Sequence, residues 1–289
     1  MGVFKRIVTL FLVFMPFVIC GSGPSWMSQL PDSIRLCEMV VWGAHDAATG
    51  HGFKGFRGAF VGSFARTQSL TIDKLWDVGV RAFDLRPVVD KDNTLPIYHG
   101  SERTNLDFHE ALALLAKSLS DNPSEFAILL LRQEKPGGDW VNLIGKALSE
   151  SGIEFVQISD SLILGDVRGK ALLLTRNEVN HPQSTLLRNW RHDTIAHVQA
   201  NNCIIKVQDI FNCTEKGRTD FKVKCALRLN DEDGWIINYL SGYERPRFAR
   251  SSKAMTKKLL SDMRKQSKLK GILMLDFVAE DMYLYKIKN

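Results

Sequence analysis

Eight short apolar runs recur along the chain, and most of them end abruptly in ionisable residues. Short apolar runs bounded in this way predict buried β-strands. The segments between them include predicted helices at residues 69–78, 107–120, 140–149 and 252–266. The predicted strands are residues 39–42, 80–85, 96–98, 126–131, 171–175, 204–208, 236–240 and 271–275.

This alternation of strands and helices favours an α/β fold, a single distorted (β/α)8 barrel of the TIM type. The distortion is expected where Pro96 follows a turn. A chain of 289 residues, 45% of them hydrophobic, suffices for one large core and leaves no room for a second domain.

In such a barrel the carboxyl ends of the strands share one rim, so the polar residues that close the strands are the candidate site. Two histidines with carboxylates to orient them can serve as base and acid in one turnover, and an adjacent arginine suits a phosphate. The combination is suited to phosphodiester cleavage. These residues are His45, Asp46, Asp84, Arg86, His99, Arg132, Glu134, Arg176, Asp209 and Asp276.

Structural roles are the alternative for several of these residues. A charged residue often closes a strand simply because the chain leaves the core there, and for Glu134 and Asp209 this reading stands beside the functional one. The other five histidines have no strand-end context and are expected to be surface or locally satisfied groups. They are His51, His109, His181, His192 and His197.

Nine short motifs, in this order and spacing, resemble the bacterial phosphatidylinositol-specific phospholipases C. They are WMSQLPD at 26–32, GAHD at 43–46, TQ at 67–68, FDLR at 83–86, YHG at 98–100, NPSE at 122–125, GDVRGK at 165–170, KVQD at 206–209 and LMLDF at 273–277. The resemblance covers most of the chain and implies cleavage of phosphatidylinositol to diacylglycerol and a cyclic inositol phosphate.

The resemblance also assigns roles. His45 is expected to deprotonate the inositol hydroxyl next to the phosphodiester, with Asp276 orienting its ring. His99 is expected to protonate the departing oxygen, with Asp46 and Asp84 as supporting carboxylates. Arg86 would bind the phosphate oxygens.

Contacts to the inositol ring are implied for Arg132, Glu134, Arg176, Asp209 and Phe211. The chain departs from the family at two of them, since relatives usually carry lysine and tyrosine where Arg132 and Phe211 stand. Whether glycosylated phosphatidylinositol anchors are accepted stays open.

No metal or other cofactor is expected, because the Arg86 guanidinium stands where calcium-using relatives have an acidic ligand. Two alternatives of other classes are a glycerophosphodiester phosphodiesterase and a catalytically silent lipid-binding barrel. The first needs acidic metal ligands at the place of Arg86, and the second is disfavoured by the intact pair of His45 and His99.

Residues 1–22 have the features of a secretory signal, with Lys5 and Arg6 before a short apolar stretch, followed by the catalytic barrel at 23–289. The protein is therefore expected to be secreted or held at the cell surface, the latter by lipidation of Cys20 as the less favoured alternative. Among the remaining cysteines, Cys203 with Cys213 or Cys213 with Cys225 are possible disulfide pairs.

The formal charge of +6 falls to +4 when Lys5 and Arg6 are removed, since 36 bases then face 32 acids. A mild positive charge favours an anionic membrane surface. The glycine- and phenylalanine-rich stretch at 52–66 is expected to insert Phe53, Phe56 and Phe60 into the bilayer, or else to be a loop packed on the barrel. No nucleic-acid motif is present, and the protein is expected to be a monomer that binds membranes peripherally.

Overall fold

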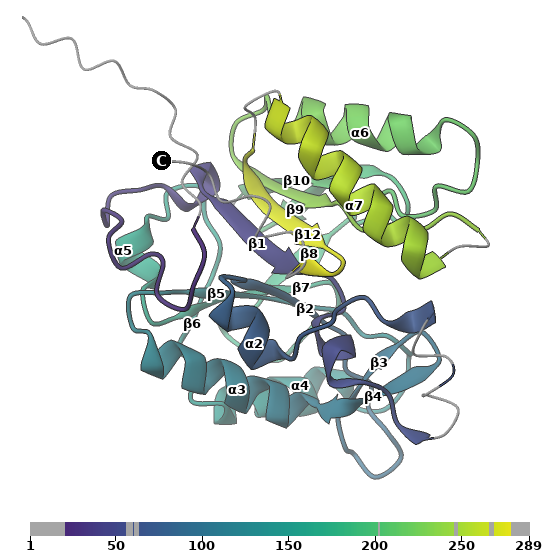
Figure 1. Ribbon diagram of the computed structural model, residues 1–289. Helices are drawn as coiled ribbons and strands as arrows, with labels where there is room; N and C mark the ends of the chain where they lie inside the picture. Colours follow the sequence, from purple (N-terminus) through teal and green to yellow (C-terminus); the bar gives the residue numbers. More distant parts are fainter. Residues whose placement is uncertain are drawn as a thin grey trace, which may run out of the picture.

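A computed structural model describes residues 21–55, 60, 64–201, 203–245, 248–265 and 269–278 (Figure 1). Residues 1–20, which hold most of the predicted signal segment and Cys20, lie outside the described residues.

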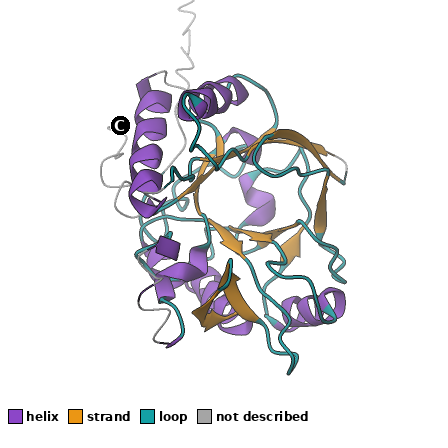
Figure 2. Cartoon of the chain, turned by 90° about the vertical axis from the view of Figure 1, so that its right-hand side faces the viewer, coloured by secondary structure: helices purple, strands orange, loops and turns teal. Residues whose placement is uncertain are grey.

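A closed barrel forms the centre of the molecule, and Figure 2 shows its ring of strands. Nine of the described strands close the ring in the order β5, β2, β1, β12, β11, β10, β9, β8 and β7, with β7 pairing back to β5. All neighbours are parallel except β9, which is antiparallel to both β8 and β10. Their bounds are β1 Val40–Ala44, β2 Ala82–Leu85, β5 Ala127–Leu131, β7 Ala171–Thr175, β8 Thr185–Arg188, β9 Ile195–Ala200, β10 Cys203–Gln208, β11 Trp235–Tyr239 and β12 Gly271–Leu275. The expected α/β barrel class is confirmed.

Residues 96–98 form a strand as predicted, but the prediction that this strand belongs to the barrel is wrong. It forms β3 (Pro96–His99), which pairs antiparallel with β4 (Glu102–Asp107) outside the ring. The hairpin folds back along the segment after β2, where Tyr98 N donates to Arg86 O and Val88 N donates to Pro96 O. Strands β8 and β9 take part in the ring instead, and the two-residue strand β6 (Phe155–Val156) pairs with the start of β7.

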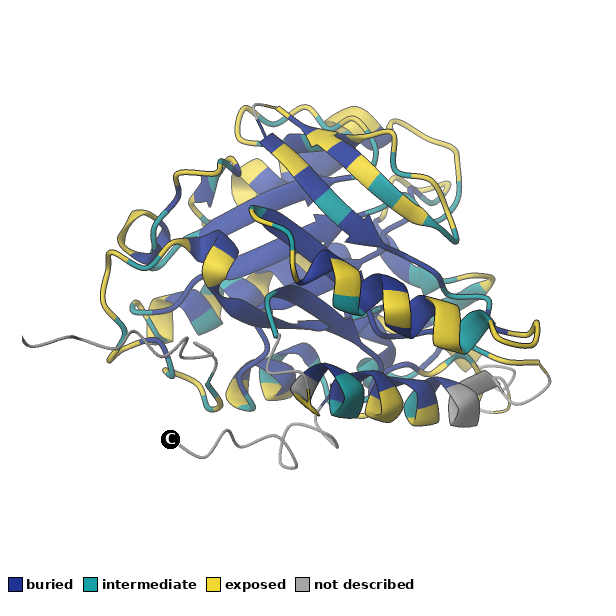
Figure 3. Ribbon diagram, turned by 90° about the horizontal axis from the view of Figure 1, so that it is seen from above, coloured by how far each residue is buried: buried dark blue, intermediate teal, exposed yellow. Residues whose placement is uncertain are grey.

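Strands β1, β2, β5, β7, β11 and β12 are buried on both faces, which explains their continuous apolar sequence. In β1 and β12, Val41, Ile272 and Met274 belong to one apolar cluster, whereas Trp42 and Leu273 belong to a second one shared with the helices. Figure 3 shows the buried strands and the exposed outer faces of the helices. The helices are η1 Leu36–Glu38, η2 Ala47–His51, α2 Ile72–Asp77, α3 Phe108–Asp121, α4 Trp140–Glu150, α5 Leu164–Val167, α6 Arg218–Leu229 and α7 Phe248–Lys265.

The four cysteines that the structure describes are buried and free, so neither possible disulfide is formed. Cys203 lies in the apolar cluster that holds Val41 and Met274, whereas Cys213 and Cys225 pack in the cluster beneath the helices. None of the described helices combines the length and the apolar character that a membrane span requires.

Candidate active site

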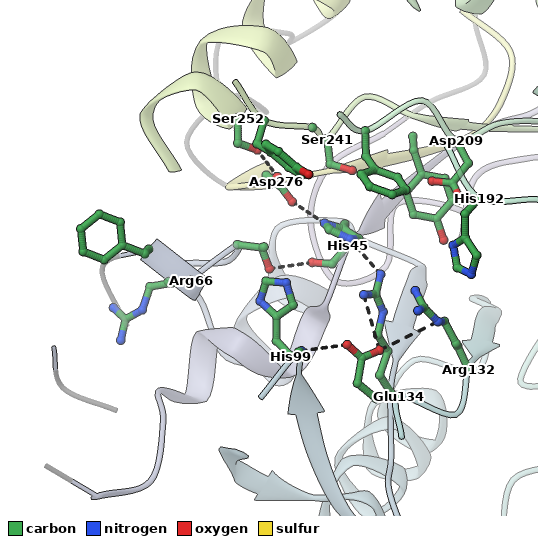
Figure 4. A pocket seen from close by; sticks show the side chains of 18 of the residues that line it. His45, Arg66, His99, Arg132, Glu134, His192, Asp209, Ser241, Ser252 and Asp276 are labelled. Atoms are coloured by element: carbon green, nitrogen blue, oxygen red, sulfur yellow. Dashed lines mark hydrogen bonds and ion pairs between the residues drawn. The ribbon is translucent and has the colours of Figure 1, made fainter. Parts of the chain in front are cut away.

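A cavity of about 360 Å³ opens at the carboxyl ends of the barrel strands (Figure 4). It gathers most of the predicted site residues from distant parts of the sequence. They are His45, Arg86, His99, Arg132, Glu134, Arg176, Asp209, Phe211 and Asp276. Asp46 and Asp84 lie immediately behind this lining, in contact with His45, His99 and Arg86.

His45 follows β1 directly and is held on both ring nitrogens. Its Nδ1 lies 2.7 Å from Asp276 Oδ1, at the end of the neighbouring strand β12. Its Nε2 lies 2.9 Å from Arg86 Nη2 and 3.1 Å from Asp46 Oδ2. Burial lowers the pKa of His45, but the carboxylates of Asp46 and Asp276 outweigh it and raise this pKa to about 9.

The backbone at His45 is fixed by the Thr67–Gln68 pair. Gln68 Nε2 donates to His45 O at 2.9 Å and to Leu275 O at 2.8 Å, which joins the ends of β1 and β12. The Thr67 hydroxyl donates to His45 O at 3.0 Å. Asp276 is oriented in turn by the hydroxyl of Ser252 from α7, which donates to its Oδ2.

Asp46 adopts a left-handed backbone conformation, with φ of 46° and ψ of 53°. This conformation is costly for a residue other than glycine and is often found at functional sites. The Asp46 side chain is 2% exposed, and its Oδ2 lies 3.1 Å from His45 Nε2 and 3.4 Å from His99 Nε2. This oxygen accepts no well-aligned hydrogen bond from a described residue, so a proton on either imidazole would face it.

His99 reaches the cavity from the end of β3, the hairpin strand that leaves the ring. Its ring centroid lies 6.3 Å from that of His45, with the planes nearly perpendicular. His99 Nδ1 is 2.6 Å from Ala65 O, and because a carbonyl can only accept, the Nδ1 atom carries a proton. Nε2 therefore remains directed at the space beside Asp46.

Arg86 lies at the centre of the charged groups. Its Nε is 2.9 Å from Asp46 Oδ1 and its Nη2 is 2.8 Å from Asp84 Oδ2. Burial lowers the pKa of Arg86, but Asp46, Asp84 and Glu134 raise it well above its ordinary value. The geometry places Asp84 on Arg86 and not on His99, which corrects the expected support of His99 by Asp84.

Of the described residues, His45, Asp46 and Asp84 are the cluster able to hold a metal ion, with one ligand atom of each lying within 4.8 Å of the others. All three contact the Arg86 guanidinium at 2.8 to 2.9 Å. A fixed guanidinium thus occupies the position that a cation bound to these ligands would need.

The opposite side of the cavity carries the residues expected to contact an inositol ring. Arg176 Nη1 lies 3.7 Å from Asp209 Oδ2, which also accepts from Trp190 Nε1 at 2.9 Å. Glu134 accepts from Gly100 N at 2.8 Å. Arg132 Nε lies 3.9 Å from Glu134 Oε2 (Figure 4).

Several residues of the site were not predicted. Tyr239 packs edge-on against His45 with 5.7 Å between ring centroids, and burial raises its pKa well above the ordinary value. Ser252 orients Asp276, and Tyr243 lines the cavity beside Phe211. His192 is exposed, as expected for a surface histidine, and it lies at the edge of the cavity, a position that the sequence did not predict.

The phenylalanine-rich stretch only partly fits its expected membrane role. Phe53 is 9% exposed and is held by a bridge to Thr104, so its buried ring is unavailable for insertion, which corrects that expectation. Phe56 lies outside the described residues. Phe60 is 71% exposed, and Phe64, which was not singled out from the sequence, is 65% exposed at the cavity.

The closed, distorted barrel is the fold of the bacterial phosphatidylinositol-specific phospholipases C. The Staphylococcus aureus enzyme superimposes with a TM-score of 0.73 at 19% identity, covering 89% of this chain and 90% of the other. The Listeria monocytogenes enzyme gives a TM-score of 0.66 at 24% identity, covering 89% and 94%.

In sequence, the chain is similar to two proteins named 1-phosphatidylinositol phosphodiesterase. The Listeria monocytogenes protein is 27% identical over 279 residues, 91% of this chain and 84% of that protein. A Staphylococcus aureus protein is 27% identical over 273 residues, 82% and 81%. No family model matches the chain. The resemblance that the sequence motifs indicated is thus confirmed.

Proposed function

We propose that the protein is a phosphatidylinositol diacylglycerol-lyase that cleaves phosphatidylinositol to diacylglycerol and inositol 1,2-cyclic phosphate. The observation that carries the proposal is the arrangement of His45 and His99 on either side of Asp46, with Arg86 between the carboxylates. The names of the two similar proteins support the same substrate.

His45 is suited to remove the proton of the inositol 2-hydroxyl. In the neutral form that can act as a base, Nδ1–H donates to Asp276 and the lone pair of Nε2 accepts from Arg86, so the inositol hydroxyl must replace Arg86 as the donor to Nε2. When Nε2 takes up the proton, it faces Asp46 Oδ2 at 3.1 Å. The carboxylates therefore stabilise the imidazolium that forms as the hydroxyl attacks the phosphorus.

His99 is suited to complete the reaction as the acid. When its ring is protonated on both nitrogens, the Nε2–H faces Asp46 Oδ2, 3.4 Å from Nε2, and can transfer its proton to the departing diacylglycerol oxygen. The new bond joins the 2-oxygen to phosphorus and the old bond to the diacylglycerol oxygen breaks, which leaves the cyclic phosphate. Because the nucleophile belongs to the substrate, no water is needed in this step.

Arg86 is suited to stabilise the charge that develops on the phosphate oxygens. Asp46 and Asp84 hold its guanidinium in place, so no rearrangement is needed when the charge appears. The ring of the headgroup would then lie against Arg132, Arg176 and Asp209, whose forks and carboxylate each bind vicinal hydroxyls. Glycosylated phosphatidylinositol anchors remain candidate substrates.

We also infer that the protein is exported and acts as a monomer at a membrane surface. The predicted signal segment at 1–22 supports export. The exposed rings of Phe60 and Phe64 support contact with the membrane. The similar Staphylococcus aureus enzyme also binds membranes, and this binding can be modulated.

The test is the phosphorus NMR spectrum of the products released from phosphatidylinositol in detergent micelles. The proposed function predicts inositol 1,2-cyclic phosphate. Release of glycerol 3-phosphate from glycerophosphoinositol, without a cyclic product, would identify a glycerophosphodiester phosphodiesterase. If neither substrate gives a product, the result would support the alternative that the protein is a catalytically silent lipid-binding barrel.

Two variants assign the activity to the site. His45→Ala and His99→Ala should each lower kcat by roughly 10²–10⁴, because each removes a proton transfer. His197→Ala changes an exposed histidine of β9 and serves as the matched control. Near-normal turnover in either site variant would contradict the mechanism.

A further inference from the structure

His99, the proposed general acid, stands outside the barrel ring at the tip of the β3–β4 hairpin. It is the last residue of β3 and pairs with Glu102 across a two-residue turn. The turn consists of Gly100 and Ser101, and Gly100 has a φ of 60°, in the left-handed region that favours glycine. A two-stranded hairpin is marginally stable by itself, so the position of His99 depends on what holds this tip.

The hairpin joins the barrel through backbone hydrogen bonds up to Tyr98. Among the described residues, the bond from Tyr98 N to Arg86 O, 3.1 Å long, is the one of these that lies nearest the tip. The imidazole of His99 contacts Ala65 O at 2.6 Å and Asp46 Oδ2 at 3.4 Å, but neither contact reaches the backbone of the turn. The turn is held instead by the residues that follow β5.

Glu134 and Lys135 grip the hairpin on either side of His99. Glu134 Oε1 accepts from Gly100 N at 2.8 Å, and Figure 4 shows this side chain directed at the chain beside His99. The Lys135 ammonium lies over the ring of Tyr98, 3.8 Å from its centroid. The residues that precede and follow His99 in the chain are therefore both held from the end of β5.

The surroundings of Lys135 suit it to this position. Its Nζ also donates to Ser101 O, in the turn, at 3.4 Å. It forms no ion pair within the described part of the chain, so the Tyr98 ring is its electrostatic partner. A cation is attracted to the negative face of an aromatic ring, and more strongly where both are partly desolvated. Tyr98 and Lys135 are both half-buried and neither lines the cavity, so any influence on the reaction must pass through another residue.

Building on the proposed function, we propose that Lys135 is a positioning residue for the general acid, whose contacts with the hairpin tip hold His99 so that Nε2 faces the departing oxygen. Proton transfer requires the acid within hydrogen-bond reach of that oxygen. A misplacement of about 1 Å can slow a reaction by roughly 10². The base His45 follows β1, and its backbone N donates to the end of β12, so it does not depend on the hairpin. Loss of Lys135 should therefore impair protonation of the leaving group and spare the attack of the inositol hydroxyl.

Two soluble substrates that share the inositol phosphate separate these two steps. The diacylglycerol oxygen of dibutanoyl phosphatidylinositol needs a proton to leave, whereas the nitrophenolate of nitrophenyl inositol phosphate leaves as a stable anion. Lys135→Met keeps the length of the side chain and removes its charge. It should lower kcat for the first substrate by roughly tenfold, part of the roughly 10²–10⁴ that an acid contributes, and change kcat for the second less than about twofold. KM should change little for both, because Lys135 does not line the cavity.

Three further variants show whether Lys135 acts through His99. Lys135→Arg should retain activity, since a guanidinium also stacks on an aromatic face. Tyr98→Leu removes the ring and should show the same selective loss as Lys135→Met. In the His99→Ala background, Lys135→Met should have no additional effect, because the group that it positions is already absent. The matched control is Lys91→Met, which removes an exposed charge from the connection into β3 and should leave both substrates unaffected.

The outcomes distinguish this proposal from the proposed function. Equal loss on the two substrates in Lys135→Met, or no loss on either, would mean that the lysine does not position the acid and would overturn the proposal. A further loss of activity when Lys135→Met is added to His99→Ala would overturn it as well. In these cases the wild-type protein still releases a cyclic inositol phosphate, and the proposed function stands. If the wild-type protein releases no cyclic phosphate from either substrate, the proposed function itself fails.

Discussion

A single carboxylate, Asp46, connects the two imidazoles of the site. The left-handed turn at Asp46 places its Oδ2 between the Nε2 atoms of His45 and His99, and the same side chain holds Arg86 through Oδ1. The oxygen between the imidazoles lacks a well-aligned hydrogen bond from the described residues. A proton arriving on His45 thus gains a partner at the moment His99 gives one up, which balances the charge around Asp46 through the proposed reaction.

The raised pKa of His45 predicts a pH dependence of stability. Its pKa is about 9 in the folded protein, above the value of 6.5 for an exposed histidine. His45 should therefore contribute stability that is fully present below pH 6.5 and is lost as the pH rises to about 9. Urea unfolding of His45→Ala should show a larger loss of unfolding free energy at pH 6 than above pH 9. His197→Ala should show no such difference, and a pH-independent loss in His45→Ala would contradict the assignment.

Arg86 predicts activity without a metal ion. Its guanidinium already contacts His45, Asp46 and Asp84, so a cation at these ligands would face a fixed positive charge. Turnover should remain within about twofold in excess EDTA, and Arg86→Ala should lower kcat by roughly 10²–10³ because a charge-stabilising donor is lost. Calcium should not restore the variant. Complete loss in EDTA that calcium reverses would instead place the chain among calcium-dependent enzymes.

At the scale of the elements, helix α4 contains Gly145, whose replacement by alanine should destabilise the protein although alanine has the higher helix propensity. Alanine is favoured over glycine in a helix by about 1 kcal/mol. A Cβ at Gly145, however, would lie 2.2 Å from Asn180 O, in the backbone segment that follows β7. Gly145→Ala should therefore lower the unfolding free energy by about 1–3 kcal/mol in a denaturant titration. The neighbouring exposed change Lys146→Ala should be nearly neutral, and a stabilised Gly145→Ala would show that the Asn180 segment yields freely.

The elements that could be predicted from sequence are those whose pattern is local. Seven of the eight predicted strands lie in the ring, and all of these except β10 are buried on both faces, while their charged ends follow from the chain leaving the core. Strand β9 was missed because its residues alternate between exposed and buried positions and include His197 and Gln199. The detachment of β3 depends on hydrogen bonds to the segment after β2, which no local pattern reveals.

The residues of the site also divide into those that a local sequence pattern predicts and those that only the tertiary fold brings to the cavity. Residues that close a strand, such as His45, Arg86 and Asp276, were predictable because parallel strands bring their carboxyl ends together. Ser252 and His192 reach the cavity from a helix and from a strand connection, so only the closed barrel places them there. Tyr239 ends β11 as an aromatic residue within an apolar run, and its sequence context resembles that of a core residue.

At the scale of the whole molecule, the catalytic cavity opens beside two exposed aromatic residues. Phe64 and Arg66 line the cavity, and Phe60 precedes them on the same segment. Phe60 and Phe64 are 71% and 65% exposed, so both rings present apolar surface to the solvent. A bilayer that receives these rings would bring its headgroups to the cavity, while Arg66 would meet anionic lipids.

This arrangement predicts a separation of membrane binding from chemistry. Phe60→Ala/Phe64→Ala should weaken binding to phosphatidylinositol-containing vesicles by roughly tenfold or more, since burying each ring contributes about 1.5–3 kcal/mol. Cleavage of soluble glycerophosphoinositol should change less than about twofold. The control is Ile204→Ala, which removes a half-exposed apolar side chain near the start of β10, at the amino end of the barrel strands. Sedimentation with vesicles measures binding. Equal losses on vesicles and on the soluble substrate would indicate damage to the fold, because membrane contact affects only the first of these measurements.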